Sequence, residues 1–207
     1  MFYQCPMGEN TLEDIIDKAN IREVIEYERY CRDYRLWDEM RKCYHDDAYI
    51  VVSWMSGTPD EFIEGSKRMN ASKAPAKHKV FNTVIWKNGD KAVAECMTVI
   101  TIRCPMDDDT VDMATYTRFH IRLEKRNGLW KILTFAPIYE KDTMHSIYTN
   151  GTFQASKEEL SQYRPTYANM MLRQVRYGLN PNGELVGEDR PESIAAMYEE
   201  SSKWLGV

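Results

Sequence analysis

The sequence predicts an α+β fold, in which a curved and mostly antiparallel sheet wraps around N-terminal helices and a helical C-terminal extension follows. Helical spacing near the N-terminus, four β-rich segments joined by tight turns, and renewed helix signals near the C-terminus predict this arrangement. The chain has 207 residues, 43% apolar and 12% aromatic, which suits one domain with a full core and an appended segment. We place the α+β domain in residues 1–142 and the extension in residues 143–207, packed on the domain or on a neighbouring subunit.

Two helices and a strand are predicted first. Thr11 to Arg32 carries apolar residues at helical spacing and predicts a helix of about five or six turns, with Asn20 as a candidate break. Leu36 to Tyr44 predicts a second, short helix that ends at Asp46-Asp47. A strand is expected over residues 48–54, because Ala-Tyr-Ile-Val-Val-Ser-Trp is rich in β-forming side chains.

A third helix and a four-strand meander complete the domain. Thr58 can cap the helix, Pro59 suits its first position and Glu61 completes a capping box, so the helix is predicted to run to about Asn70. Polar turn sequences such as Asn127-Gly128 then separate the strands. The strands are predicted over His78–Lys87, Lys91–Arg103, Met113–Lys125 and Leu129–Tyr139. A meander of this kind can curl around the first helix and leave a cavity at its open end.

The extension carries three further helix signals. Ser156-Lys157-Glu158-Glu159 is a capping box that opens a short helix. Tyr167 to Tyr177 predicts a second helix, stopped by Gly178. A final helix is expected after Asp189-Arg190-Pro191-Glu192. The segment is too small for a core of its own and must pack on something else.

Composition excludes several classes of protein. No stretch approaches the roughly 20 consecutive apolar residues of a membrane helix, and the N-terminus has no signal-peptide pattern, so we expect a cytoplasmic protein without a membrane partner. The net charge is −5 and the basic residues are scattered, which argues against nucleic acid. The odd number of cysteines and the lack of a CxxC pair predict buried free thiols at Cys5, Cys31, Cys43, Cys96 and Cys104.

Three short patterns, in the same order and at similar spacing, resemble those of a known family. Asp33 lies four residues before Trp37-Asp38, as in the D-x3-W-[DE] segment of SnoaL-like proteins. His78 lies four residues before Asn82 and is followed by Gly89-Asp90-Lys91-Ala92, which is similar to the H-x3-N…G-D-x-A strand pair. Residues 127–132, Asn-Gly-Leu-Trp-Lys-Ile, are similar to the late hairpin. The chain therefore resembles the SnoaL-like, NTF2-like superfamily over roughly residues 10 to 140, near the scytalone dehydratases and bile-acid 7α-dehydratases.

This resemblance implies an NTF2-like cone with a small-molecule pocket, and a catalytic pair formed by Asp33 and His78. An aspartate in an apolar pocket is desolvated, which raises its pKa and makes it a usable base. A nearby imidazole can exchange a proton and be held in one tautomer by the aspartate. The alternatives are a surface Asp33 that finishes the helix and a His78 that meets solvent at a strand entry.

Six further residues are expected to bind substrate. Tyr30 lies one helical turn before Asp33, and Tyr116 and His120 share a strand face. A tyrosine there could hold a substrate oxygen. Asn82 is expected on the same strand face as His78. The last two candidates, Val52 and Trp54, lie at the end of the first predicted strand.

The site departs from the family at two positions. Val52 stands where scytalone dehydratase has a catalytic tyrosine, and Pro137 stands where bile-acid dehydratases have an arginine. His45-Asp46-Asp47 is interpreted as a turn between helix and strand rather than as a metal site. No metal and no cofactor is expected. The resemblance implies a homodimer or homotrimer.

Three functions follow from these observations. The first is a cofactor-independent lyase or isomerase that acts on a hydrophobic oxygenated ring compound, such as a steroid, polyketide or phenolic, through Asp33 and His78. The second is a non-catalytic ligand-binding protein, and the third is an assembly protein like the β subunit of a ring dioxygenase. The fold alone does not decide between them.

Overall fold

The computed structural model describes residue 8, residues 10–71 and residues 75–207. Cys5 lies outside these residues, and the other four cysteines are buried free thiols as predicted. Six strands form one sheet in the described part of the chain, in the order β2-β1-β6-β5-β4-β3. The strands are β1 (Tyr44–Val52), β2 (Met55–Gly57), β3 (Lys77–Asn88), β4 (Lys91–Met106), β5 (Asp109–Arg126) and β6 (Leu129–Ser146).

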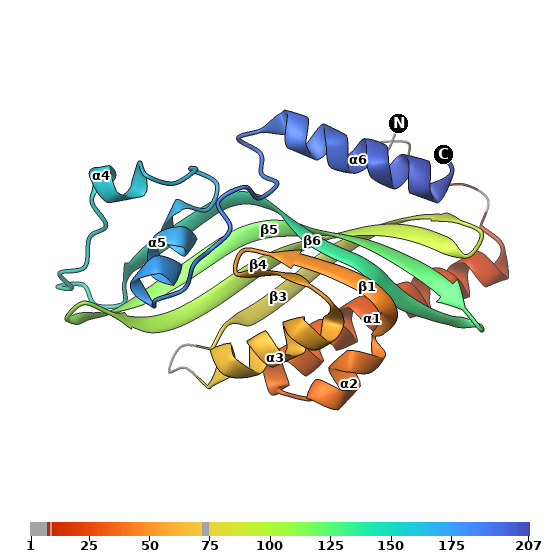
Figure 1. Cartoon of the computed structure of the whole chain (residues 1–207), viewed down its shortest axis with the longest axis horizontal. Coiled ribbons are helices and arrows are strands. Elements are labelled where there is room, and N and C mark those ends of the chain that lie inside the picture. Colours follow the sequence, from red (N-terminus) through yellow and green to blue (C-terminus); the bar gives the residue numbers. More distant parts are fainter. Residues whose placement is uncertain (1–7, 9, 72–74) are drawn as a thin grey trace.

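Helices cover both faces of this sheet (Figure 1). They are α1 (Leu12–Tyr34), α2 (Trp37–Lys42), α3 (Pro59–Asn70), α4 (Lys157–Leu160), α5 (Ala168–Arg176) and α6 (Pro191–Leu205). Figure 1 shows α1, α2 and α3 on one face, α6 on the opposite face, and α4 with α5 at one end. None of the described helices is long and apolar enough to cross a membrane.

The predicted α+β class with a curved, mostly antiparallel sheet is confirmed. β1 runs parallel to β6, and every other neighbouring pair of strands is antiparallel. The β3–β6 meander was expected from its turns, and Asn127 and Gly128 both adopt a positive φ at the last of them. The Thr58 capping box is also present, with Pro59 at the first helical position.

Two predictions about the N-terminal elements are wrong. α1 is unbroken at Asn20, because its buried face holds Asp17, Ile21 and Ile25 at helical spacing on either side of that residue. The turn predicted at residues 45–47 is instead part of β1, which pairs with β6 from its first residue.

A buried acid joins α1 to the late hairpin. The Asp17 carboxylate, 2% exposed, accepts a hydrogen bond of 2.7 Å from the indole nitrogen of Trp130. It also lies 3.0 Å from the Lys125 ammonium and 3.3 Å from that of Lys87. These partners compensate the desolvation of a buried charge and fix the helix against three strands. The tryptophan of the late-hairpin pattern therefore positions α1 in the curl of the sheet.

The two faces of the sheet have different cores. Alternate residues of β5, including Phe119 and Ile121, pack with the helices α1 and α3 on the inner face. On the outer face, α6 packs Ile194, Tyr198 and Leu205 against the sheet. Polar contacts add to this packing, since Arg122 donates to Ser201 and Glu200 of α6.

The C-terminal extension begins inside the sheet. β6 continues to Ser146, so the boundary placed at residues 142 and 143 falls within a strand. The Asp142 carboxylate accepts hydrogen bonds from Met170 N and Asn169 Nδ2 at the start of α5. This contact seats α5 at the end of the sheet where the inner face is open.

Candidate functional site

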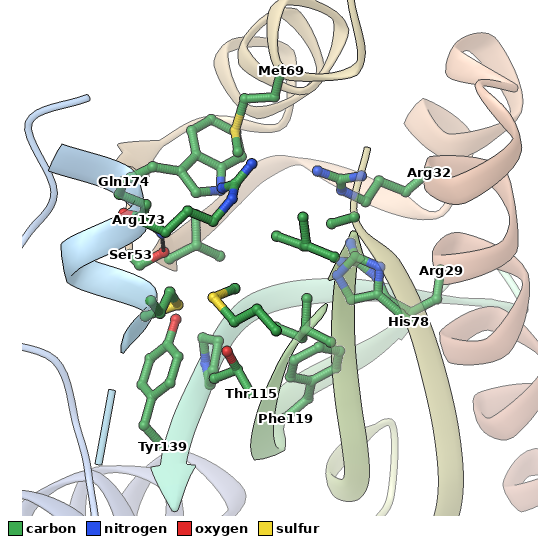
Figure 2. Close-up of a pocket in the computed structure, with 18 of the residues that line it drawn as sticks. Arg29, Arg32, Ser53, Met69, His78, Thr115, Phe119, Tyr139, Arg173 and Gln174 are labelled. Carbon is green, nitrogen blue, oxygen red and sulfur yellow. Dashed lines mark hydrogen bonds between the residues drawn. The ribbon is translucent and has the colours of Figure 1, made fainter. Parts of the chain in front are cut away.

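A cavity of about 60 Å³ lies on the inner face, between the C-terminal half of α1, α3, the sheet and α5. Its apolar walls come from the sheet and α3, with Phe62, Phe119 and Phe135 among them. The polar side chains come from α1, β3, β5, β6, α5 and the turn between β1 and β2 (Figure 2). They are Arg29, Arg32, Ser53, His78, Thr115, Tyr139, Arg173 and Gln174. A volume of this size holds a few water molecules or the reacting end of a small ring compound.

Asp33 and His78 meet at the edge of this cavity. Asp33 lies in the last turn of α1, and His78 is the second residue of β3. Their side chains are 6% and 5% exposed. Asp33 Oδ1 lies 2.7 Å from His78 Nδ1, and Asp33 Oδ2 accepts the His78 backbone N–H at 2.6 Å. Lys77 Nζ also donates to the main-chain oxygen of Asp33 at 2.5 Å, so the start of β3 is tied to the end of α1.

This geometry fixes the proton on one ring nitrogen. The ionised carboxylate can only accept, so His78 Nδ1 carries the hydrogen and donates it to Asp33. Nε2 is then the unprotonated nitrogen of a side chain that lines the cavity. Burial lowers the pKa of His78 to about 4, and the charges of Arg29 and Arg32 act in the same direction against the opposing effect of Asp33.

The expectation that Asp33 has a raised pKa is wrong. Burial does raise the pKa of Asp33, but the hydrogen bonds and charge of His78 outweigh it, and the pKa is lowered overall. The carboxylate is therefore ionised over a wide pH range and orients the imidazole. The nitrogen that can take a proton from a ligand is His78 Nε2.

Two arginines of α1 contribute positive charge to the same wall. Arg29 forms an ion pair with Glu28, whose other contact is the Tyr44 hydroxyl at 2.6 Å, and its guanidinium packs against Phe135 with 4.9 Å to the ring centroid. Arg32 has fewer hydrogen-bond partners than Arg29 in the described part of the chain. Its Nη1 atom lies 4.0 Å from Asp33 Oδ1, beyond hydrogen-bond distance, and is buried without a hydrogen-bond partner among the described residues.

The opposite wall offers neutral polar groups. Gln174 Nε2 donates to Ser53 Oγ at 2.7 Å, whereas Gln174 Oε1 is buried without a hydrogen-bond partner in the described chain. Thr115 Oγ1, fully buried on β5, is in the same situation. Burial raises the pKa of Tyr139, so its phenol is neutral. Gln174 Oε1 and Thr115 Oγ1 can therefore form a hydrogen bond with a polar group that enters the cavity.

A wider groove of about 610 Å³ adjoins the cavity, and both are lined by Trp54, Met69 and Arg173. Trp54 stacks on Phe62 at 5.5 Å and lies against Gly65 of α3, where a Cβ atom would approach the indole to 2.4 Å. The groove gives a ligand space outside the small inner cavity.

The structure places two of the six expected substrate contacts, Val52 and Trp54, in the cavity wall. Asn82 is exposed, because a register shift between Val80 and Thr83 inserts an extra residue into β3 and reverses which side chains face inward. Tyr30 is 51% exposed, and its ring packs at a tilt against that of Tyr34, 4.5 Å between centroids, on the solvent side of α1. Neither residue lines the cavity.

Tyr116 and His120 also lie outside the cavity, because they belong to the outward-facing set of β5. His120 is buried beneath α6, where its ring nitrogens contact Glu95 at 2.9 Å and Ser201 at 2.7 Å. The ring of Tyr116 packs under Lys141 at 5.0 Å. The inward set of β5 includes Met113, Thr115 and Phe119.

Sequence reasoning missed most of the polar lining. The position of Arg29, four residues before Asp33 on one helix, was an available signal, because such residues share a face. Thr115 could have been found from the alternation of apolar residues along β5. Gln174 and Arg173 carried no such signal, because nothing local in the sequence indicates where α5 docks.

The family of the chain follows from comparison with known proteins. Residues 13–136 match the model of the SnoaL-like domain, and the chain belongs to this family. A PEP2-like protein of Fusarium vanettenii is 25% identical over 201 residues, which cover 92% of this chain and 86% of the relative. Pea pathogenicity protein 2 of the same organism is 27% identical over 155 residues, covering 73% and 66%.

Solved structures show the same fold. A putative scytalone dehydratase from Novosphingobium aromaticivorans aligns with a TM-score of 0.56 at 13% identity, over 70% of this chain and 97% of that protein. A type 3 hexachlorocyclohexane dehydrochlorinase from Novosphingobium barchaimii aligns with a TM-score of 0.53 at 14% identity, over 70% and 99%. The SnoaL-like, NTF2-like fold predicted from the sequence is therefore confirmed, with dehydratase-type proteins among its structural neighbours.

Proposed function

We propose that the protein is a cofactor-independent lyase or isomerase that removes a proton next to a carbonyl group of an oxygenated ring compound. One observation carries this proposal: His78, held by Asp33 through Nδ1 and the backbone N–H, lines a small cavity and keeps Nε2 as the nitrogen that can accept a proton. An oriented neutral imidazole is a general base, and a positioned base of this kind accelerates proton transfer by about 10²- to 10⁴-fold.

The reaction proceeds in two steps that balance without an added oxidant or reductant. His78 Nε2 takes the proton from the carbon next to the carbonyl, and the electrons of the C–H bond form an enolate. When a hydroxyl group stands on the adjacent carbon, the C–O bond then breaks and the leaving oxygen takes the proton from Nε2, which releases water. If no such group is present, the proton returns to a different carbon and the double bond shifts.

The charges around His78 suit this chemistry. Arg32 places a guanidinium with an unpartnered Nη1 on the cavity wall, where it can hold a negatively charged oxygen of the substrate. Gln174 Oε1 and Thr115 Oγ1 can accept or share the hydrogen of a substrate hydroxyl. The inner cavity of about 60 Å³ accommodates only the reacting end, so the rest of a larger substrate would lie in the adjoining groove.

Incubation with a panel of β-hydroxy cyclic ketones, dihydrophenols and unsaturated cyclic ketones tests this proposal. We expect at least one compound to lose water, seen as a mass loss of about 18 Da, or to shift its double bond, seen as a change in ultraviolet absorption. The same reaction should take up deuterium from D₂O at the carbon next to the carbonyl, because proton abstraction is reversible.

His78→Gln is the matched control, since glutamine can donate to Asp33 but offers no basic nitrogen. Binding of panel members without conversion or deuterium uptake would favour a receptacle without catalysis. Equal deuterium uptake in wild type and His78→Gln would contradict the role of His78.

A further inference from the structure

The inner cavity has an unbalanced distribution of charge. Its ionised lining residues, among those the structure describes, are Arg29, Arg32 and Arg173, and no aspartate or glutamate lines it. Asp33, the nearest carboxylate to Arg32, lies behind the wall and is engaged by His78. The surface that a ligand meets is therefore cationic, although the whole chain carries a net charge of −5.

Arg32 is the guanidinium of this wall with an open hydrogen-bond donor, and its nearest carboxylate, Asp33, is 4.0 Å away. Its side chain is 4% exposed, and Nη1 has no hydrogen-bond partner among the described residues. Burial and the neighbouring charge of Arg29 lower the pKa of Arg32 to about 10, which still leaves it ionised at neutral pH. A buried cation with an open donor is strongly unfavourable unless an acceptor completes it, so the position indicates an anionic ligand atom.

A second guanidinium faces Arg32 across the cavity. Figure 2 shows Arg173 reaching in from α5 and Arg32 from α1, with their guanidinium groups directed toward one another and His78 beside Arg32. Arg173 is 3% exposed and stacks on Tyr177 with 4.6 Å between its guanidinium carbon and the ring centroid. A carboxylate between two guanidinium groups can receive parallel hydrogen bonds from each, which a neutral carbonyl cannot match.

We propose that the substrate carries a carboxylate, which binds at Arg32 on the side of the cavity that faces Arg173 and places the reacting ring carbon beside His78. This inference deepens the proposed function. It rests on that function only in calling the ligand a substrate, because binding of the carboxylate does not require catalysis. Since Gln174 Oε1 and Thr115 Oγ1 remain open to a hydroxyl on the other side, the ligand class is a small cyclic acid that also bears a hydroxyl or keto group.

The carboxylate also affects the base. Arg29 and Arg32 both act to lower the pKa of His78, so an anion bound at Arg32 offsets part of their effect and makes Nε2 a stronger base. The group that selects the substrate thereby improves proton transfer in the complex. A neutral analogue of the same shape would leave the base weak.

Binding of simple carboxylates tests the inference without any turnover. Isothermal titration of wild-type protein with benzoate, cyclohex-1-enecarboxylate and 4-hydroxybenzoate should give saturable binding of at least one of these acids. The amide that matches this acid should bind at least about 10-fold more weakly. Arg32→Gln should weaken carboxylate binding about 10-fold or more, and Arg32→Lys should retain part of it, because lysine keeps the charge and loses the planar fork.

Arg22→Gln is the matched control, because Arg22 is an exposed arginine of the same helix that lines neither the cavity nor the groove. It should bind the carboxylate as wild type does. Circular dichroism establishes that each variant is folded. If Arg32→Gln does not fold, the comparison of carboxylate with amide on wild type and Arg32→Lys carries the test.

Three results would overturn the inference: no carboxylate binds, acid and amide bind alike, or Arg22→Gln loses binding while Arg32→Gln retains it. The two proposals fail separately. If carboxylates bind at Arg32 and are never converted, the anion site is supported and the catalytic function is contradicted. If a neutral ketone is turned over and no carboxylate binds, the catalytic function is supported and the anion site is contradicted.

Discussion

Replacement of His78 by glutamine is expected to lower the turnover of the panel compound that wild type converts by about 10²- to 10⁴-fold. The reason is chemical, since the glutamine amide can still donate to Asp33 Oδ1 but offers no lone pair that accepts a proton. KM should change little, because binding depends on the arginine wall and the open polar groups of α5 and β5 rather than on the base. Steady-state kinetics measures both parameters.

His45→Gln is a suitable comparison for this variant. His45 is a histidine of β1, and its Nε2 contacts the main-chain oxygen of Glu124 at 2.9 Å on another part of the sheet. It should leave turnover unchanged. Wild-type turnover in folded His78→Gln would remove the base from the proposed mechanism.

Asp33→Asn is expected to lower turnover by a similar factor, for a different reason. The asparagine amide can donate to His78 Nδ1, so that nitrogen becomes the acceptor and the proton moves to Nε2. The imidazole then presents an N–H to the cavity in place of a lone pair, and turnover falls by about 10²-fold or more. The fold should persist, because asparagine has nearly the same shape and its oxygen can still accept the His78 backbone N–H, a bond of 2.6 Å in the native protein.

The combination of the two substitutions separates a pair from independent groups. If Asp33 acts only by orienting His78, the double variant should be about as slow as His78→Gln alone, because effects within one unit are not additive. Turnover that falls by the product of the two single effects would show that Asp33 contacts the substrate independently. Thermal unfolding of the three variants supplies the control for stability.

The meeting of Asp33 and His78 could be anticipated from short patterns, because both residues lie at element ends. The last turn of α1 and the first residues of β3 are joined through Lys77 and His78, so a helix end and a strand start fix the pair. Family resemblance supplied the expectation, and local geometry explains it.

Other parts of the site depend on features that a single sequence does not display. The extra residue between Val80 and Thr83 reverses the facing of the remainder of β3, which removed Asn82 from the expected wall. For β5, the alternation was visible, but the polar set containing Tyr116 and His120 was taken as inward. That set faces outward, and α6 covers the part of it that holds His120.

The C-terminal extension is the clearest limit. Its helices could be placed from capping and periodicity, whereas its docking depends on contacts over long sequence separations, such as Gln174 with Ser53 and Met170 with Asp142. These contacts bring Arg173 and Gln174 into a cavity built mainly from residues of the SnoaL-like domain. Tertiary packing, rather than local propensity, therefore brings Arg173 and Gln174 into the polar lining.

The central claim is that His78 is a neutral imidazole with its proton on Nδ1, and nitrogen NMR of protein labelled at histidine observes this directly. We expect the Nδ1–H tautomer at pH 7, with His78 becoming charged only as the pH falls through about 4, well below the ordinary value of 6.5. His78→Gln assigns the signal by its disappearance. An imidazolium at pH 7, or a proton on Nε2, would contradict the account.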